Sequence, residues 1–171
     1  MSDLVYTPSQ TNGPLFGFAL LPDEITSVRV PEGKRALHLS GVILDGAGEH
    51  IDYGAFVEFW SQGQAVRVRT LKGRFSTTLI WPGPRRLADG KVLAPQISVM
   101  LSTRGLSNTL WTKIFLPDTP ELAQDPIWNA IDPDRRPYAL ARPEGEGFVF
   151  DWHLQGEREA PVFDLHGEDE A

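Results

Sequence analysis

The amino-acid sequence predicts an all-β fold, namely an antiparallel β-sandwich with one or two short helices. Three observations support this prediction. Short segments of alternating apolar and polar residues, about seven in all, follow one another closely along the chain, as they do in sandwiches. The 171 residues include 16 glycines and 14 prolines, which suits many tight turns. Helix-start signals are concentrated in one stretch, between Pro120 and Ile131.

The predicted strands are the segments in which apolar and polar residues alternate. They span residues 36–44, 55–60, 65–71, 74–81, 93–101, 109–116 and 148–154, and residues 161–165 can add an edge strand. The alternation is clearest in 93–101, where Ile97, Val99 and Leu101 share one face of the strand. We expect that face to be buried. The polar residues Gln96 and Ser98 share the opposite face.

Turn residues separate the strands and mark the helices. Residues 45–49 are rich in Asp and Gly, and we interpret them as a β-turn, because the ligand spacing of an EF-hand calcium loop is absent. Lys72-Gly73 is a turn signal, so we expect the strands before and after it to form a hairpin. Thr119-Pro120 and Asp125-Pro126 each place a capping oxygen before a proline, which predicts two helix starts.

The amino-acid composition limits which binding partners and which cellular location we expect for the protein. The formal net charge of −7 disfavours nucleic acid and anionic membrane surfaces as partners. The chain has no cysteine, which excludes disulfides and thiolate metal ligands. No apolar run has transmembrane length, and the first residues lack the features of a signal peptide. We therefore expect a cytoplasmic protein that has no membrane partner.

The length of the chain predicts one folded domain. The residues at its start indicate an arm that precedes this domain. Prolines and glycines in residues 1–22 exclude a regular helix there, and Leu15, Phe16 and Phe18 need cover from the domain or from a partner. We expect an extended N-terminal arm over 1–22 that packs on a partner, and a β-sandwich domain over 23–171. An ordinary terminal loop is the alternative interpretation of the arm.

No established catalytic motif is present in the sequence. It has neither a glycine-rich phosphate loop nor a nucleophile elbow. Arg67 and Arg69 could bind an anion, although such a row more often faces solvent. Gln96 and Ser98 have the spacing at which a His-x-His pair would present two imidazoles to a metal. The four histidines lack metal-binding spacing; they are His38, His50, His153 and His166.

The order of several segments resembles a known family. These segments are 6–14 (YTPSQTNGP), 39–46 (LSGVILDG), 57–60 (VEFW), 74–78 (RFSTT), 94–99 (APQISV), 103–105 (TRG), 111–115 (WTKIF), 134–140 (DRRPYAL) and 148–156 (FVFDWHLQG). Together they are similar to the α subunits of intradiol ring-cleaving dioxygenases of the protocatechuate 3,4-dioxygenase type. The resemblance runs over nearly the whole chain, from Tyr6 to Leu165.

The resemblance implies a chain without a metal of its own. In this family the catalytic β subunit binds non-haem Fe(III) through two tyrosines and two histidines. The histidine positions correspond to Gln96 and Ser98 here, and no tyrosine lies between Tyr53 and Tyr138, where both tyrosine ligands should fall. The resemblance thus implies a hetero-oligomer with no catalytic residue and no cofactor in this chain. Iron in the partner would open the protocatechuate ring with O2 to give 3-carboxy-cis,cis-muconate, a step of aromatic catabolism in the β-ketoadipate pathway.

The resemblance also assigns a wall of the substrate pocket to this chain. The Thr-x-Gly-Pro of the arm, here Thr11, Gly13 and Pro14, corresponds to the segment that reaches the pocket at the interface. Arg104 corresponds to an arginine that attracts the carboxylate of the small aromatic acid substrate, as a guanidinium is suited to do. A loop residue is the alternative interpretation of Thr11, and a surface turn is that of Arg104.

Two departures from the family leave an alternative function open. The connections over 60–66 and 21–37 are shorter than in the family, which affects the expected α–β contact surface. Gln96 also replaces a histidine that many α chains keep. The alternative is a stand-alone, non-catalytic β-sandwich binding module derived from the same fold. An independent hydrolase has no support in the sequence.

Overall fold

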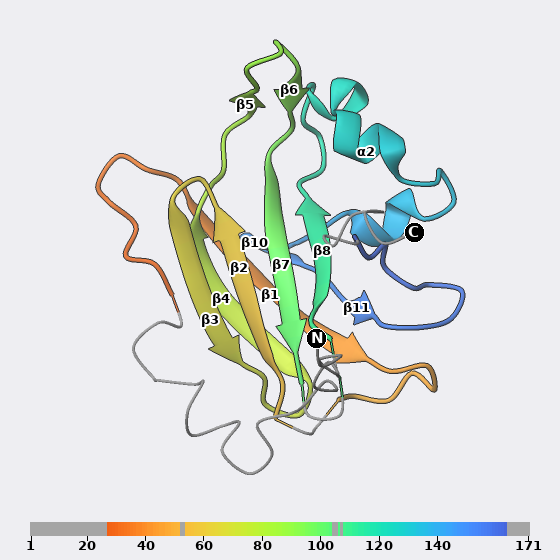
Figure 1. The fold of residues 1–171 in the computed structure, drawn as a ribbon. Coiled ribbons are helices and arrows are strands. Elements are labelled where there is room, and N and C mark those ends of the chain that lie inside the picture. The colour runs from red at the N-terminus through yellow and green to blue at the C-terminus, as the bar shows by residue number, and fades with distance from the viewer. Residues whose placement is uncertain (1–26, 52–53, 104–105, 107, 164–171) are drawn as a thin grey trace, which may run out of the picture.

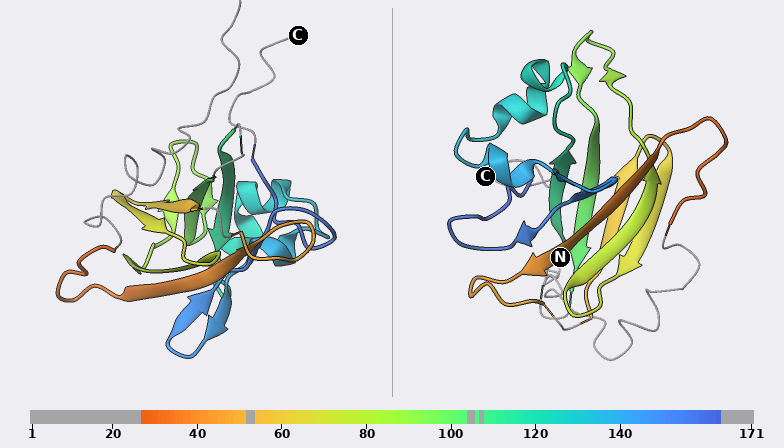
Figure 2. Two further views of the ribbon diagram at one scale, coloured as in Figure 1. Left: turned by 90° about the horizontal axis from the view of Figure 1, so that it is seen from below. Right: turned by 180° about the vertical axis from the view of Figure 1, so that it is seen from behind.

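Two β-sheets packed face to face make up the body of the protein in the computed structural model (Figure 1, Figure 2). The structure describes residues 27–51, 54–103, 106 and 108–163. One of these sheets has five strands and the other has four. A third, two-stranded sheet lies beyond one end of this sandwich. The predicted all-β sandwich is therefore confirmed.

The five-stranded sheet is organised around β1 (Ala36–Leu44), which pairs with β4 (Arg74–Ile80) in antiparallel fashion. Two short strands near the C-terminus, β10 (Gly147–Val149) and β11 (Trp152–His153), lie parallel to β1. β9 (Arg142–Glu144) pairs with β10. The sequence predicted one strand over 148–154 and only antiparallel pairs, whereas the structure interrupts that segment and makes two parallel pairs.

The four-stranded sheet is antiparallel throughout and has the order β3-β2-β7-β8. Its strands are β2 (Phe56–Ser61), β3 (Gln64–Arg69), β7 (Gln96–Ser102) and β8 (Leu110–Phe115). The predicted alternation in β7 is confirmed, because Ile97, Val99 and Leu101 are fully buried while Gln96 and Ser98 are only partly buried.

The predicted hairpin around Lys72-Gly73 is correct only at its turn. Leu71 and Arg74 form an antiparallel bridge, and both turn residues have positive φ, 52° for Lys72 and 71° for Gly73. Beyond the bridge the strands separate, because β3 pairs with β2 and β4 pairs with β1 in the opposite sheet. The turn therefore connects the two layers of the sandwich.

A second difference concerns the start of the segment predicted as 93–101. Val92–Leu93 form β6, which pairs with β5 (Arg85–Arg86) in a small hairpin. Ala94 and Pro95 then lead into β7, which begins at Gln96. Figure 1 shows the β5–β6 hairpin projecting past the end of the four-stranded sheet.

Helical structure is sparse among the described residues; two of its elements lie in the predicted stretch between Pro120 and Ile131, and a third lies beyond it. The 3-10 helix η3 (Leu122–Gln124) is followed by α2 (Pro126–Ala130), and η4 (Arg136–Ala139) comes shortly afterwards. Asp125 caps α2 and Pro126 occupies its first turn, as predicted from the Asp-Pro pair. No helix among the described residues is long and apolar enough to cross a membrane.

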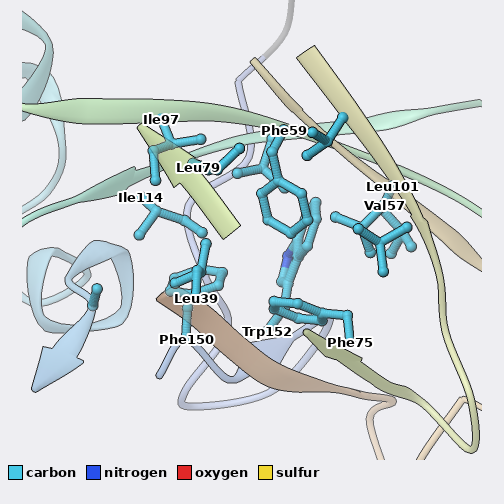
Figure 3. Close-up of a cluster of buried hydrophobic side chains, with 14 of the residues drawn as sticks. Leu39, Val57, Phe59, Phe75, Leu79, Ile97, Leu101, Ile114, Phe150 and Trp152 are labelled. Carbon is cyan, nitrogen blue, oxygen red and sulfur yellow. The ribbon is translucent and has the colours of Figure 1, made fainter. Parts of the chain in front are cut away.

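The core lies between the sheets and draws on both of them (Figure 3). Phe59 of β2 and Phe75 of β4 pack with ring centroids 5.4 Å apart, which joins the layers directly. Trp152 belongs to the same cluster and is fully buried. Burying aromatic rings of this size removes much apolar surface from water, so these contacts stabilise the stacking of the two sheets.

Candidate functional site: a cationic cleft at the start of β7

A cleft of about 500 Å³ opens at the end of the four-stranded sheet where β2 ends and β7 begins. The β5–β6 hairpin contributes Arg85 and Leu93 to its lining, and the β2–β3 turn contributes Gln62 and Gly63. Both degenerate ligand positions named from the sequence, Gln96 and Ser98, line this cleft. The sheet therefore presents the polar face of β7 to a hollow rather than to open solvent.

Strand register sets three side chains in a row beneath the cleft. Trp60 of β2 lies opposite Ser98 of β7, and Ser98 lies opposite Lys113 of β8. Residues directly opposite in antiparallel strands share a face and stand close enough to interact. The three side chains therefore point to the same side of the sheet, and all three line the cleft.

Lys113 provides a charge in this row. Its Nζ donates a hydrogen bond to Ser98 Oγ over 2.8 Å. Burial lowers the pKa of Lys113, because it disfavours the charged ammonium. The negative charge of Asp125 opposes this effect on the pKa, and the positive charge of Arg85 adds to it. Two cationic side chains thus act on one small volume.

Gln96 is held by a buried carboxylate behind the cleft wall. Its Nε2 donates to Asp125 Oδ2 over 2.8 Å, and the backbone N–H of Ala94 donates to the same oxygen over 2.7 Å. Asp125 is fully buried, and its other oxygen accepts from the backbone N–H groups of Ile127 and Trp128. Among the residues that the structure describes, none is a hydrogen-bond partner of the buried Gln96 Oε1.

The residues present do not fit ferric iron. Iron sites of this kind need imidazole, phenolate or carboxylate donors, whereas this position offers a carboxamide and a hydroxyl. The ammonium group of Lys113 occupies the hydrogen-bonding position beside Ser98, and its charge opposes a metal cation. Within the described part of the chain, no group of three or more His, Cys, Asp or Glu side chains is placed to hold a metal.

The other predicted site residues lie outside the described residues. They are Thr11, Gly13, Pro14 and Arg104, which the resemblance placed in the pocket wall. The arginine row considered for anion binding is partly paired: Arg67 forms a 2.5 Å ion pair with the buried carboxylate of Glu58. That pair makes Arg67 a structural residue of the four-stranded sheet.

Sequence reasoning missed the cleft because its two charged residues come from separate segments of the chain. Lys113 alternates with apolar residues in the predicted strand 109–116, on the same face as Trp111 and Phe115, and Arg85 lies in a proline- and glycine-containing stretch between two predicted strands. A lysine between two aromatic residues on one strand face was the available signal. Its proximity to Ser98 depends on the register of β7 and β8, which the sequence does not display.

Comparison with known proteins supports the predicted resemblance. The protocatechuate 3,4-dioxygenase alpha chain of Burkholderia cepacia is 28% identical over 203 aligned positions, which cover 96% of this chain and 100% of the relative. No protein-family model matches the chain.

Solved structures with a similar fold include dioxygenases. Catechol 1,2-dioxygenase from Acinetobacter sp. ADP1 is 15% identical with a TM-score of 0.59, over 75% of this chain and 55% of that one. The dioxygenase domain of a carbohydrate-binding fusion protein from Streptomyces sp. SirexAA-E is 24% identical with a TM-score of 0.54, over 91% and 99% of the two chains. The present chain thus spans little more than half of the Acinetobacter catechol dioxygenase, but nearly all of the Streptomyces domain.

Proposed function

We propose that this chain, which has the fold of the intradiol ring-cleaving dioxygenases, is the non-iron-binding α subunit of a protocatechuate 3,4-dioxygenase. The observation that carries the proposal is the similarity to an alpha chain over nearly the full length of both proteins. The cleft adds support, because the polar positions of β7 carry Gln96 and Ser98, and Lys113 brings a positive charge to them.

In this proposal the catalytic residues and the Fe(III) belong to a β subunit. That partner would be a longer relative that keeps the two tyrosines and two histidines. The present chain would supply scaffold and one wall of a pocket for a catecholic acid, through the arm residues Thr11, Gly13 and Pro14 and through Arg104. The guanidinium of Arg104 would face the substrate carboxylate, a pairing that favours binding over turnover.

The test is co-expression with such a partner. We expect the present chain alone to be colourless and iron-free, and the pair to show a ferric-tyrosinate absorption band and to consume O2 with protocatechuate. The partner alone and a pair with one ligand tyrosine of the partner changed to Phe are the controls. Iron bound to this chain alone, or ring cleavage by it without a partner, would exclude the proposal.

A variant pair tests the contribution of the pocket wall. Arg104→Gln is expected to raise the KM of the pair for protocatechuate about tenfold, since a charge-assisted hydrogen bond is worth about 1.5–3 kcal/mol. Arg158→Gln removes the same charge from an exposed position and should leave KM unchanged. Equal KM values for both variants would remove Arg104 from the proposed pocket.

A stand-alone binding module is the second candidate, and the cationic cleft is the observation that favours it. A binding module needs a shaped site of its own. The cleft meets this requirement, since all the residues that line it belong to this chain. A monodisperse, folded chain that does not associate with the co-expressed β subunit would support this candidate over the first.

A further inference from the structure

We infer that Lys113 is a site of non-enzymatic acylation, at which an acyl phosphate transfers its acyl group to Nζ. The inference concerns the chemistry of one amine and does not rest on the proposed pairing with a β subunit. It is carried by the fixed position of this amine in the cleft and by the charges of the residues around it.

The amine of Lys113 is held at the surface of the cleft. Lys113 and Ser98 lie opposite each other on β8 and β7, and both line the cleft. Lys113 Nζ donates a hydrogen bond to Ser98 Oγ over 2.8 Å, which fixes the position of the nitrogen. The cleft has a volume of about 500 Å³, so a reagent of a few heavy atoms has room to reach Nζ from it.

The surroundings of Lys113 favour the loss of its proton, without which an amine is not a nucleophile. Burial lowers the pKa of Lys113, and the positive charge of Arg85 lowers it further. The carboxylate of Asp125 acts in the opposite direction, but it is fully buried and already accepts four hydrogen bonds from other groups. At pH 7 Lys113 therefore has a larger neutral fraction than an exposed lysine.

The charges of the cleft select an anionic acyl donor. Arg85 of the β5–β6 hairpin lines the cleft together with Lys113, and the described lining residues include neither Asp nor Glu. A guanidinium pairs with a phosphate group through two parallel hydrogen bonds. The phosphate of an acyl phosphate can thus bind Arg85 while its acyl carbon lies in the volume that Nζ faces.

The transfer is a substitution at the acyl carbon. The lone pair of the neutral Nζ attacks this carbon and forms the new C–N bond. The bond between the carbon and the bridging oxygen breaks, and inorganic phosphate leaves with its electron pair. The nitrogen loses one proton to water. No atom is oxidised or reduced, and the acyl phosphate is the only co-reactant.

The product suits the site better than the free ammonium does. Acylation converts Lys113 to a neutral amide, so the desolvation that disfavours its charge no longer applies. The amide keeps one N–H group, which can still donate to Ser98 Oγ. The repulsion between two cations that line the same cleft also disappears, and Arg85 alone keeps its charge.

The other lysines of the sequence serve as internal references. They are Lys34, Lys72 and Lys91, and all three are exposed. Lys91 forms a 2.9 Å ion pair with Asp89, and this contact raises the pKa of Lys91. Lys113 and Lys91 are therefore expected to be the fastest and the slowest of the four lysines toward an acyl phosphate.

The experiment is incubation of the purified full-length chain with acetyl phosphate at pH 7. Mass spectrometry of its peptides gives the initial rate of acetylation at each lysine. We expect Lys113 to react about fivefold faster, or more, than each exposed lysine, because its neutral fraction is larger and Arg85 binds the reagent. A rate at Lys113 no higher than that at Lys34 or Lys72 would overturn the inference.

A second reagent isolates the role of Arg85. N-hydroxysuccinimidyl acetate carries no charge, so its rate at Lys113 reports the reactivity of the amine alone. Arg85→Gln should lower the ratio of the acetyl phosphate rate to this neutral-reagent rate several-fold. Arg29→Gln removes the same charge from an exposed position outside the cleft and should leave the ratio unchanged. An unchanged ratio in Arg85→Gln would overturn the selection of an acyl phosphate.

Competition by inorganic phosphate keeps the test decisive if Arg85→Gln does not fold. Excess phosphate should slow the acetylation of Lys113 by acetyl phosphate several-fold and leave the rates at the exposed lysines unchanged. Sodium chloride at the same ionic strength is the control for screening. Equal rates at Lys113 in phosphate and in chloride would contradict the site. A negative result leaves the oxygen-consumption assay of the paired chains unaffected, so the two proposals fail separately.

Discussion

The carboxamide of Gln96 donates to the carboxylate of Asp125 over 2.8 Å, although the two residues stand 29 positions apart in the chain. This hydrogen bond connects the first residue of β7 with the N-cap of α2. Asp125 also accepts the backbone N–H of Ala94, so one buried carboxylate holds the entry to β7 and the start of the helix together. The back wall of the cleft is therefore rigidly anchored.

Removing the Asp125 carboxylate should destabilise the fold. Asp125→Ala leaves the N–H groups of Ala94, Gln96, Ile127 and Trp128 without their acceptor, and we expect a loss of roughly 3–5 kcal/mol in the free energy of unfolding. Urea denaturation followed by circular dichroism measures this. Asp134→Ala, at an exposed position, is the control and should change stability by less than about 0.5 kcal/mol. Similar stability of the two variants would show that Asp125 does not anchor the wall.

Lys113 should make stability depend on pH at the alkaline end. Burial lowers its pKa below the ordinary value of 10.5, so between the folded pKa and 10.5 the unfolded chain binds more protons than the folded chain. The contribution of this residue to the free energy of unfolding therefore rises with pH across that window. Below the folded pKa the lysine is charged in both states, and burying its charge destabilises the folded chain. Lys113→Met removes both effects and should be more stable than the original chain at pH 7, by less than about 1 kcal/mol because solvent screens a side chain that is only partly buried.

Urea unfolding of both proteins at pH 7 and pH 10 checks this prediction. The advantage of Lys113→Met should shrink at the higher pH, because the original lysine loses its proton there. A stability difference that is the same at both pH values would contradict the assignment of the shifted pKa.

The ion pair between Glu58 and Arg67 should be structural. The Glu58 side chain is 7% exposed and that of Arg67 is 27% exposed, and the guanidinium also lies 4.9 Å over the ring of Phe56. Arg67→Met leaves a buried carboxylate without its cation, and we expect a loss of about 2–4 kcal/mol. The double variant Glu58→Leu/Arg67→Met should recover most of that loss. Thermal and urea melts of the three variants measure the coupling; purely additive losses would contradict it.

Gly41 should not tolerate a side chain. A Cβ at this position of β1 would lie 1.8 Å from the backbone oxygen of Phe150, so the chain crossing beside β1 would have to move. Gly41→Ala is expected to cost more than about 3 kcal/mol or to prevent folding, as severe overpacking does. Gly83→Ala is the control, since nothing lies within 4 Å of its Cβ position. The soluble yield and the melting temperature of both variants test this prediction, and equal values for the two would contradict it.

Local alternation was sufficient to predict most strands and the buried faces within them. In β7 the period of two separates Ile97, Val99 and Leu101 from Gln96 and Ser98, because successive side chains of an extended chain point to opposite faces. The Asp125-Pro126 pair likewise gave the start of α2, since a capping oxygen and a restrained φ act within one turn.

The order of segments also carried the resemblance to the α subunits, which the similarity to an alpha chain confirms. It placed Gln96 and Ser98 on one strand face, which the structure shows at the cleft. The arm and Arg104 lie outside the described residues and stay predictions.

The sequence by itself determined which segments are extended, which side chains face the core, and where a helix begins, because each depends on neighbours a few residues apart. Tertiary structure alone decided that the strands around Lys72-Gly73 enter different sheets, that β10 and β11 run parallel to β1, and that Lys113 stands beside Ser98. The physical reason is that strand pairing and register are chosen by packing over the whole core, so the charge in the cleft is set by contacts between segments distant in the chain.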